Sequence, residues 1–268
     1  MTINTRIQTV LFITACFSGT VNGALVDGVS LQFVPATTGG TTQPVSGSWW
    51  GADVTSATVY TPLVPHDGLV LGSAQPATGS HSGPPDGSEN PTITEPWISF
   101  GSTGMHHSVS PITVINASGN TATLDFSGFS IAWNGIPNIS LGGDPANFPN
   151  ELGIAAVVCG IDCGIGDTFV LNYAAHEVPE IGGQLHTLHL EGTIVQIPDG
   201  DINNDGQVNA ADLLLAMRIL TGLHTPTAGE QNRWDVAPLV GGVPQPDTQN
   251  TLADYVVLLR KVEGIISF

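Results

Sequence analysis

The chain has 268 residues, enough for one medium and one small domain, and its 23 Asp and Glu residues against 5 Lys and Arg give a formal charge of −18. Residues 24–200 contain no Lys or Arg but 15 acidic residues. Such a surface repels phosphate backbones and anionic lipids, which argues against nucleic acid as a partner and leaves a neutral glycan or a cation as compatible ligands.

Residues 1–23 have the pattern of a signal peptide, with Arg6 before a short apolar run at 10–17 and the small residue Gly23 at the expected cleavage point. An alternative is that residues 13–16 form a lipobox and Cys16 carries a lipid. No other stretch is long and apolar enough to cross a bilayer, so we expect no transmembrane segment. The sequence therefore predicts export, to the periplasm or the extracellular space.

Two cysteines remain after cleavage at Gly23, and they stand close together as Cys159 and Cys163. An oxidising compartment favours a small disulfide-closed loop. A redox motif would have two intervening residues rather than three, and zinc would need further ligands.

Residues 24–198 follow the period of strands. Ala122, Leu124 and Phe126 alternate with polar residues, and turn-forming clusters of Gly, Pro, Ser, Thr and Asn separate many short apolar runs. These runs lie at 29–34, 57–60, 97–100, 112–115, 129–133, 153–158, 169–173 and 186–194. The pattern predicts a mainly β domain of the β-sandwich or jelly-roll-like kind.

Candidate ligands occur in this segment without a decisive motif. The loop at 72–96 could present His81, Asp86 and Glu89 to solvent or to a metal. The histidine pairs 106/107 and 186/189 have odd spacings, which on a strand place the two rings on opposite faces, so we interpret them as packing or surface residues.

The sequence identifies no catalytic residue, and a protein without enzymatic activity is the favoured interpretation. Glycoside hydrolysis needs two facing carboxylates, and the available ones are Glu95, Asp125, Glu151, Glu177, Glu180 and Glu191, none of which is marked as a pair. The tryptophans could stack on sugars or fill the core, and these are Trp49, Trp50, Trp97 and Trp133.

Several stretches of this segment resemble the β-rich domains of exported bacterial proteins, some of which carry sorting tails of the PEP-CTERM kind. The stretches are 80–91, 133–136, 142–148, 159–163 and 188–192. The resemblance implies export and a β-rich fold but no activity.

Residues 201–212 have the spacing of an EF-hand-type calcium loop. Oxygen-bearing side chains stand at loop positions 1, 3, 5, 9 and 12, Gly206 stands at position 6, and Gln207 at position 7 offers its carbonyl. The predicted Ca²⁺ ligands are Asp201, Asn203, Asp205, Gln207, Asn209 and Asp212. A helix is expected to follow at 211–222, with Asn209 and Asp212 at capping-box spacing.

The same scheme returns 42 residues later, where Thr251 and Asp254 repeat the capping spacing. The second loop runs from Asp235 to Asp254, which is 20 residues instead of 12, so eight are inserted. Its expected ligands are Asp235, Ala237, Asp247, Gln249, Thr251 and Asp254. Ala237 has no side-chain oxygen, so we expect this site to bind Ca²⁺ more weakly or not at all.

A duplicated loop and helix, without a helix before the first loop, resembles a type I dockerin at residues 199–268. The resemblance implies Ca²⁺-dependent folding and binding to a cohesin-like partner through the helix faces beside loop positions 10 and 11. Those positions are apolar here, at 210–211 and 252–253, which also suits another protein surface or docking on the chain's own β-sandwich. The alternative function is that of a dockerin-borne carbohydrate-binding module or glycoside hydrolase in a polysaccharide-degrading system.

Overall fold

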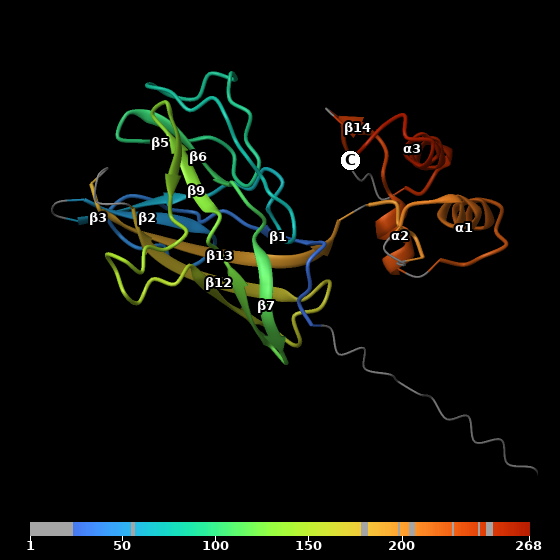
Figure 1. The fold of residues 1–268 in the computed structure, drawn as a ribbon, viewed down its shortest axis with the longest axis horizontal. Helices are drawn as coiled ribbons and strands as arrows, with labels where there is room; N and C mark the ends of the chain where they lie inside the picture. Colours follow the sequence, from blue (N-terminus) through green and yellow to red (C-terminus); the bar gives the residue numbers. More distant parts are fainter. Residues whose placement is uncertain are drawn as a thin grey trace, which may run out of the picture.

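The computed structural model describes residues 24–54, 57–177, 182–197, 199–203, 207–226, 228–240, 242–244 and 249–268. The expected signal peptide at 1–23 and the alternative at Cys16 lie outside these residues. The described part is mainly β, and its named strands form antiparallel pairs in two large sheets and one small one (Figure 1).

The larger sheet has nine strands and is organised around β13, which pairs with β12, β2 and β1. Along its main path the order is β3-β2-β13-β12-β11-β8-β7, and β1 also pairs with β4. The strands are β1 (Val29–Phe33), β2 (Trp49–Val54), β3 (Ala57–Pro62), β4 (Leu69–Val70), β7 (Thr113–Ser118), β8 (Thr121–Asp125), β11 (Ile154–Cys159), β12 (Thr168–His176) and β13 (Leu185–Gln196).

The second sheet has four strands in the order β10-β9-β6-β5. They are β5 (Trp97–Ser99), β6 (Ser102–Ser108), β9 (Phe129–Trp133) and β10 (Ile136–Ser140). One hydrophobic core joins the two sheets, because Trp50 and Leu190 of the larger sheet belong to the same buried cluster as Trp97 and Ile131 of the smaller one. The prediction of a mainly β domain is therefore confirmed.

Alternating burial explains why the strand period could be read in β8. Ala122 and Leu124 are buried while Thr121 is exposed. Each large apolar side chain removed from water in this way stabilises the fold by about 1.5–3 kcal/mol.

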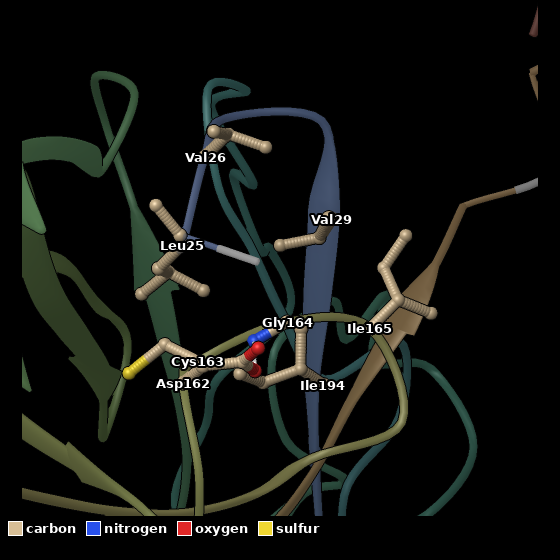
Figure 2. Close-up of a pocket in the computed structure, with 9 residues that line it drawn as sticks. Leu25, Val26, Val29, Asp162, Cys163, Gly164, Ile165 and Ile194 are labelled. Carbon is tan, nitrogen blue, oxygen red and sulfur yellow. Dashed lines mark hydrogen bonds between the residues drawn. The ribbon is translucent and has the colours of Figure 1, made fainter. Parts of the chain in front are cut away.

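Cys159 and Cys163 form the predicted disulfide, with an S–S distance of 2.02 Å. The loop that they close is also held by Asp167, whose Oδ2 accepts hydrogen bonds from the backbone N–H groups of residues 161, 162 and 163. Figure 2 shows this loop beside the beginning of the described chain, where Leu25, Val29 and Ile194 help to line a largely apolar pocket of about 330 Å³.

Three helices gather beside the sheets (Figure 1): α1 (Ala210–Leu220), α2 (Ala228–Trp234) and α3 (Leu252–Val262). A short hairpin of β14 (Leu239–Val240) and β15 (Val243–Pro244) lies between α2 and α3 in the chain. The region has a core of its own, whose buried residues are Ile202, Ala216, Trp234, Val236 and Leu258. Among the described residues, no helix is long and apolar enough to cross a membrane.

Candidate calcium loops

The Asp212 carboxylate ties together three positions of the first loop. Its Oδ1 accepts a hydrogen bond from the backbone N–H of Asn203 at 3.2 Å, and its Oδ2 accepts one from the N–H of Asn209 at 2.9 Å. Asp201 and Asp212 are both buried. The carbonyl of Gln207 accepts from the Asn209 side chain at 3.5 Å, and the expected ligand Asp205 lies outside the described residues, as does Gly206.

The predicted capping box is present at the start of α1. The Asn209 side chain accepts a hydrogen bond from the N–H of Ala211 at 2.8 Å, and the Asp212 carboxylate accepts one from the N–H of Asn209. Because Asp212 holds both the helix start and the backbone of loop position 3, an ordered loop and an ordered helix depend on the same carboxylate.

The second loop repeats these contacts around Asp254. The N–H of Ala237 donates to Oδ1 at 2.8 Å, and the N–H of Thr251 donates to Oδ2 at 2.7 Å. Thr251 caps α3 as Asn209 caps α1, by accepting from the N–H of Ala253. Loop positions 3, 9 and 12 therefore correspond in the two repeats despite the eight inserted residues. Asp247 lies outside the described residues.

The repeats also contribute equivalent residues to the small core. Position 2 is buried in both, as Ile202 and Val236, and so is the residue four after position 12, as Ala216 and Leu258. Arg233 joins the repeats because its guanidinium donates to the carbonyl of Ile202 at 3.1 Å. Burial raises the pKa of the neighbouring Asp199 carboxyl, and the charge of Asp201 acts in the same direction.

The donor set of the first loop fits a hard divalent cation. Calcium takes six to eight oxygen ligands, and each carboxylate oxygen offers two lone pairs. In the contacts with described residues, each Asp212 oxygen accepts one backbone N–H, which leaves a second lone pair on each for a cation. Two buried carboxylates in one loop are costly without a compensating charge, and a bound cation would supply it.

The second loop fits less well. Its third position is Ala237, and Oδ2 of Asp254 already accepts from both the N–H and the hydroxyl of Thr251. Asp235 is buried at position 1, as Asp201 is in the first loop. Within the described residues, each loop has two of its expected carboxylate ligands. The second loop lacks a side-chain ligand at position 3.

Three of the carboxylates considered for catalysis lie beside histidines, namely Glu151, Glu177 and Glu191. Among the described residues, six of the eight histidines lie 2.5–3.5 Å from a carboxylate oxygen. The pairs are His66 with Asp67, His81 with Asp86 and Glu89, His176 with Glu151, His186 with Glu177, His189 with Glu191, and His224 with Glu230. Glu180 lies outside the described residues. Sequence reasoning had grouped His81, Asp86 and Glu89, but it missed the other pairs because no motif marks them.

The other two histidines, His106 and His107, are buried in β6. Trp97 donates its indole N–H to Nδ1 of His106 at 3.1 Å, so the ring proton of a neutral His106 lies on Nε2, an atom without a hydrogen-bond partner among the described residues. Burial first, then the charges of His186 and His107, lower the pKa of His106 from 6.5 to about 3. The histidines at 186 and 189 face opposite sides of the sheet, as predicted: one stacks on Trp50 and the other on Trp49.

The tryptophans are packing residues. Trp49, Trp50 and Trp97 are buried, and Trp133 is half-buried with its indole N–H on the carbonyl of Ser99. Their faces contact Tyr60, histidines or each other, so an exposed sugar-stacking platform built from these four residues is not present.

Comparisons of the chain with protein-family models, with curated protein sequences and with solved structures gave no match.

Proposed function

We propose that residues 199–268 form a dockerin-like module that binds Ca²⁺ and attaches an exported protein to a protein partner. The observation that supports this most directly is the repeated hydrogen-bond pattern around Asp212 and Asp254, which brings positions 3, 9 and 12 of each loop together. Asp201, Asn203, Asp205, Gln207, Asn209 and Asp212 would hold the ion in the first loop. When bound, the cation would neutralise carboxylates that otherwise repel one another.

The partner would contact two similar helix surfaces. Ala210, Ala211 and Leu214 are exposed on α1, and Leu252, Ala253 and Val256 occupy the equivalent exposed positions on α3. Leu214 and Leu252 are 62% and 63% exposed, so these side chains are open to a partner rather than packed against the sheets. Exposed apolar residues on a charged module suit a partner with a complementary apolar patch, in a cohesin-like manner. The two-sheet domain, which we interpret as a β-sandwich, would be the part that is attached.

The test is calorimetric titration of the full mature chain with Ca²⁺. We expect one site in the first loop, with any second site weaker. Asp201→Asn and Asp212→Asn should each weaken the tighter site by about tenfold or more, because ligand charge sets the affinity of such loops. Glu263→Gln, which changes an exposed carboxylate just after α3, is the matched control and should bind as the native protein does.

The proposal fails if Ca²⁺ produces no saturable heat, or if Asp201→Asn and Asp212→Asn bind like Glu263→Gln. Attachment is tested separately, with Leu214→Asp and Leu252→Asp in a pull-down against a cohesin module. Binding by the native chain that both substitutions abolish, at unchanged Ca²⁺ affinity, would support a helix-face contact.

A further inference from the structure

The loop between β4 and β5 holds a second cluster of potential metal ligands, far in sequence from the calcium loops. One ligand atom each from His81, Asp86 and Glu89 lies within 4.8 Å of the other two. Nε2 of His81 is 3.0 Å from Oε1 of Glu89 and 3.5 Å from Oδ1 of Asp86. A tetrahedral zinc centre with bonds of about 2.0–2.2 Å separates its ligand atoms by about 3.3 Å. The two distances from Nε2 of His81 are close to this value.

The direction of the His81 ring is set from outside the cluster. Nδ1 lies 2.9 Å from the backbone carbonyl of Ser82, an oxygen that can only accept, so Nδ1 carries the proton. Nε2 of the neutral ring then presents a lone pair to two carboxylates. Three acceptors that converge on one point repel one another unless a proton or a cation lies between them. Histidine ligands of metals commonly donate their other N–H to a carbonyl in this way.

Glu89 is held in place before any ligand arrives. Its side chain is only 2% exposed, and its carboxylate accepts hydrogen bonds from the N–H groups of Asp86 at 3.0 Å and Gly87 at 2.8 Å. Two backbone hydrogen bonds between Thr78 and Asn90 close the loop at its base, and the N–H of Thr103 on β6 donates to the carbonyl of His81. The ligand positions therefore do not depend on a freely moving loop.

Charge favours a cation at this point. The segment 24–200 contains no Lys or Arg, so no fixed positive side chain from it can balance Asp86 and Glu89. One imidazole and two carboxylates are a donor set for divalent first-row transition metals, whereas calcium and magnesium prefer oxygen alone.

We propose that His81, Asp86 and Glu89 bind a divalent transition metal ion of the zinc class. Asp86 is 62% exposed, so the three protein ligands leave a coordination position on the solvent side that water or a small anionic ligand can occupy. The site is independent of the calcium loops, and it fastens the 78–90 segment next to β6.

Zinc titration of the untagged full chain, in excess Ca²⁺ to saturate the C-terminal loops, tests the proposal. We expect one Zn²⁺ per chain, and Co²⁺ in its place should give visible absorption bands of a four- or five-coordinate ion. His81→Gln should weaken binding at least tenfold. The matched control is His189→Gln, because His189 lies 2.9 Å from Glu191 in a similar pair but belongs to no three-ligand cluster within the part of the chain that the structure describes.

The proposal is overturned if the native chain binds no Zn²⁺, or if His81→Gln and His189→Gln weaken Zn²⁺ binding equally. The contact between His81 and the carboxylates is then an ion pair only. Glu89→Gln serves as a second variant, and its apo thermal unfolding is measured so that a loss of folding is not mistaken for a loss of a ligand. Asp201→Asn should retain the zinc site, which separates this test from that of the calcium loops.

Discussion

His106 makes the stability of the two-sheet domain depend on pH. The ring is fully buried, accepts a hydrogen bond from Trp97 and has a pKa lowered to about 3 in the folded chain, against 6.5 when exposed. Between these two values the unfolded chain binds a proton that the folded chain does not. Stability must therefore fall as the pH drops below 6.5.

The size of the effect follows from the shift. Each pH unit in this window costs about 1.4 kcal/mol, so lowering the pH from 6.5 to 5.0 should remove about 2 kcal/mol through His106 alone. The loss is a large part of the 5–15 kcal/mol that typically separates folded from unfolded domains. Burial also lowers the pKa of His107, which adds to the same trend.

The measurement is urea unfolding followed by tryptophan fluorescence at pH 7.5 and 5.0, at fixed ionic strength and saturating Ca²⁺. His106→Gln keeps an acceptor for the Trp97 indole but cannot be protonated. It should be less stable than the native chain at pH 7.5, yet lose about 2 kcal/mol less on acidification. His66→Gln, at a half-exposed histidine, is the control. Equal losses in the native chain and His106→Gln would refute the reasoning.

Three further outcomes are expected. Removing Ca²⁺ with a chelator should lower the unfolding temperature of the C-terminal helices in a calorimetric scan. A ligand at 100 times its Kd stabilises the folded state by about 2.7 kcal/mol. In Asp212→Asn the chelator should make no difference to this temperature. Trp234→Ala should destabilise the same helices by about 3–5 kcal/mol, measured by circular dichroism, because Trp234 is the largest buried side chain of their core. Gly104→Ala should cost the two-sheet domain about 1–3 kcal/mol in urea unfolding, because the new Cβ would lie 2.2 Å from the Trp97 ring; an unchanged midpoint would show that the ring can move aside.

Local periodicity predicted the class of the larger domain, because burial on one face produces alternation within a single strand. Periodicity could not predict, for every strand, which face is buried. In β11 the apolar side chains of Ile154 and Val158 are about half exposed while Ala155 and Val157 are buried, so both faces have apolar residues. Residue type alone does not distinguish these two sides.

The repeat in the C-terminal region was predictable because its signals are local. The 42-residue spacing placed Asp254 opposite Asp212, and the hydrogen bonds from Ala237 and Thr251 agree with that alignment. Helix α2 was missed. It spans seven residues with Trp234 as its one large apolar side chain, too few to establish a helical period.

Contacts between distant strands were beyond the sequence. Trp50 donates its indole N–H to Nδ1 of His186, 136 residues away, because β2 pairs with β13 in a register that only the folded sheet fixes. Glu151, in the loop before β11, is a similar case: its carboxylate accepts from the backbone N–H of His176, 25 residues away, at 2.8 Å. The histidines were expected to be packing or surface residues, and His81 was the one for which the sequence indicated candidate carboxylate neighbours.

The histidine–carboxylate contacts matter because residues 24–200 contain no Lys or Arg. Among its own residues, that segment can offer a carboxylate a positive side chain only from a histidine, and five of the six histidine–carboxylate pairs described above belong to it. In the C-terminal module the proposed partner of the buried carboxylates is a metal ion. Acid affects the histidine contacts and the cation sites in opposite ways. Protonation gives an imidazole a positive charge, but it removes from a carboxylate the negative charge that a bound cation needs. Mild acidification should therefore weaken the calcium loops, and through the buried His106 and His107, whose pKa values burial lowers, it should also oppose folding of the two-sheet domain.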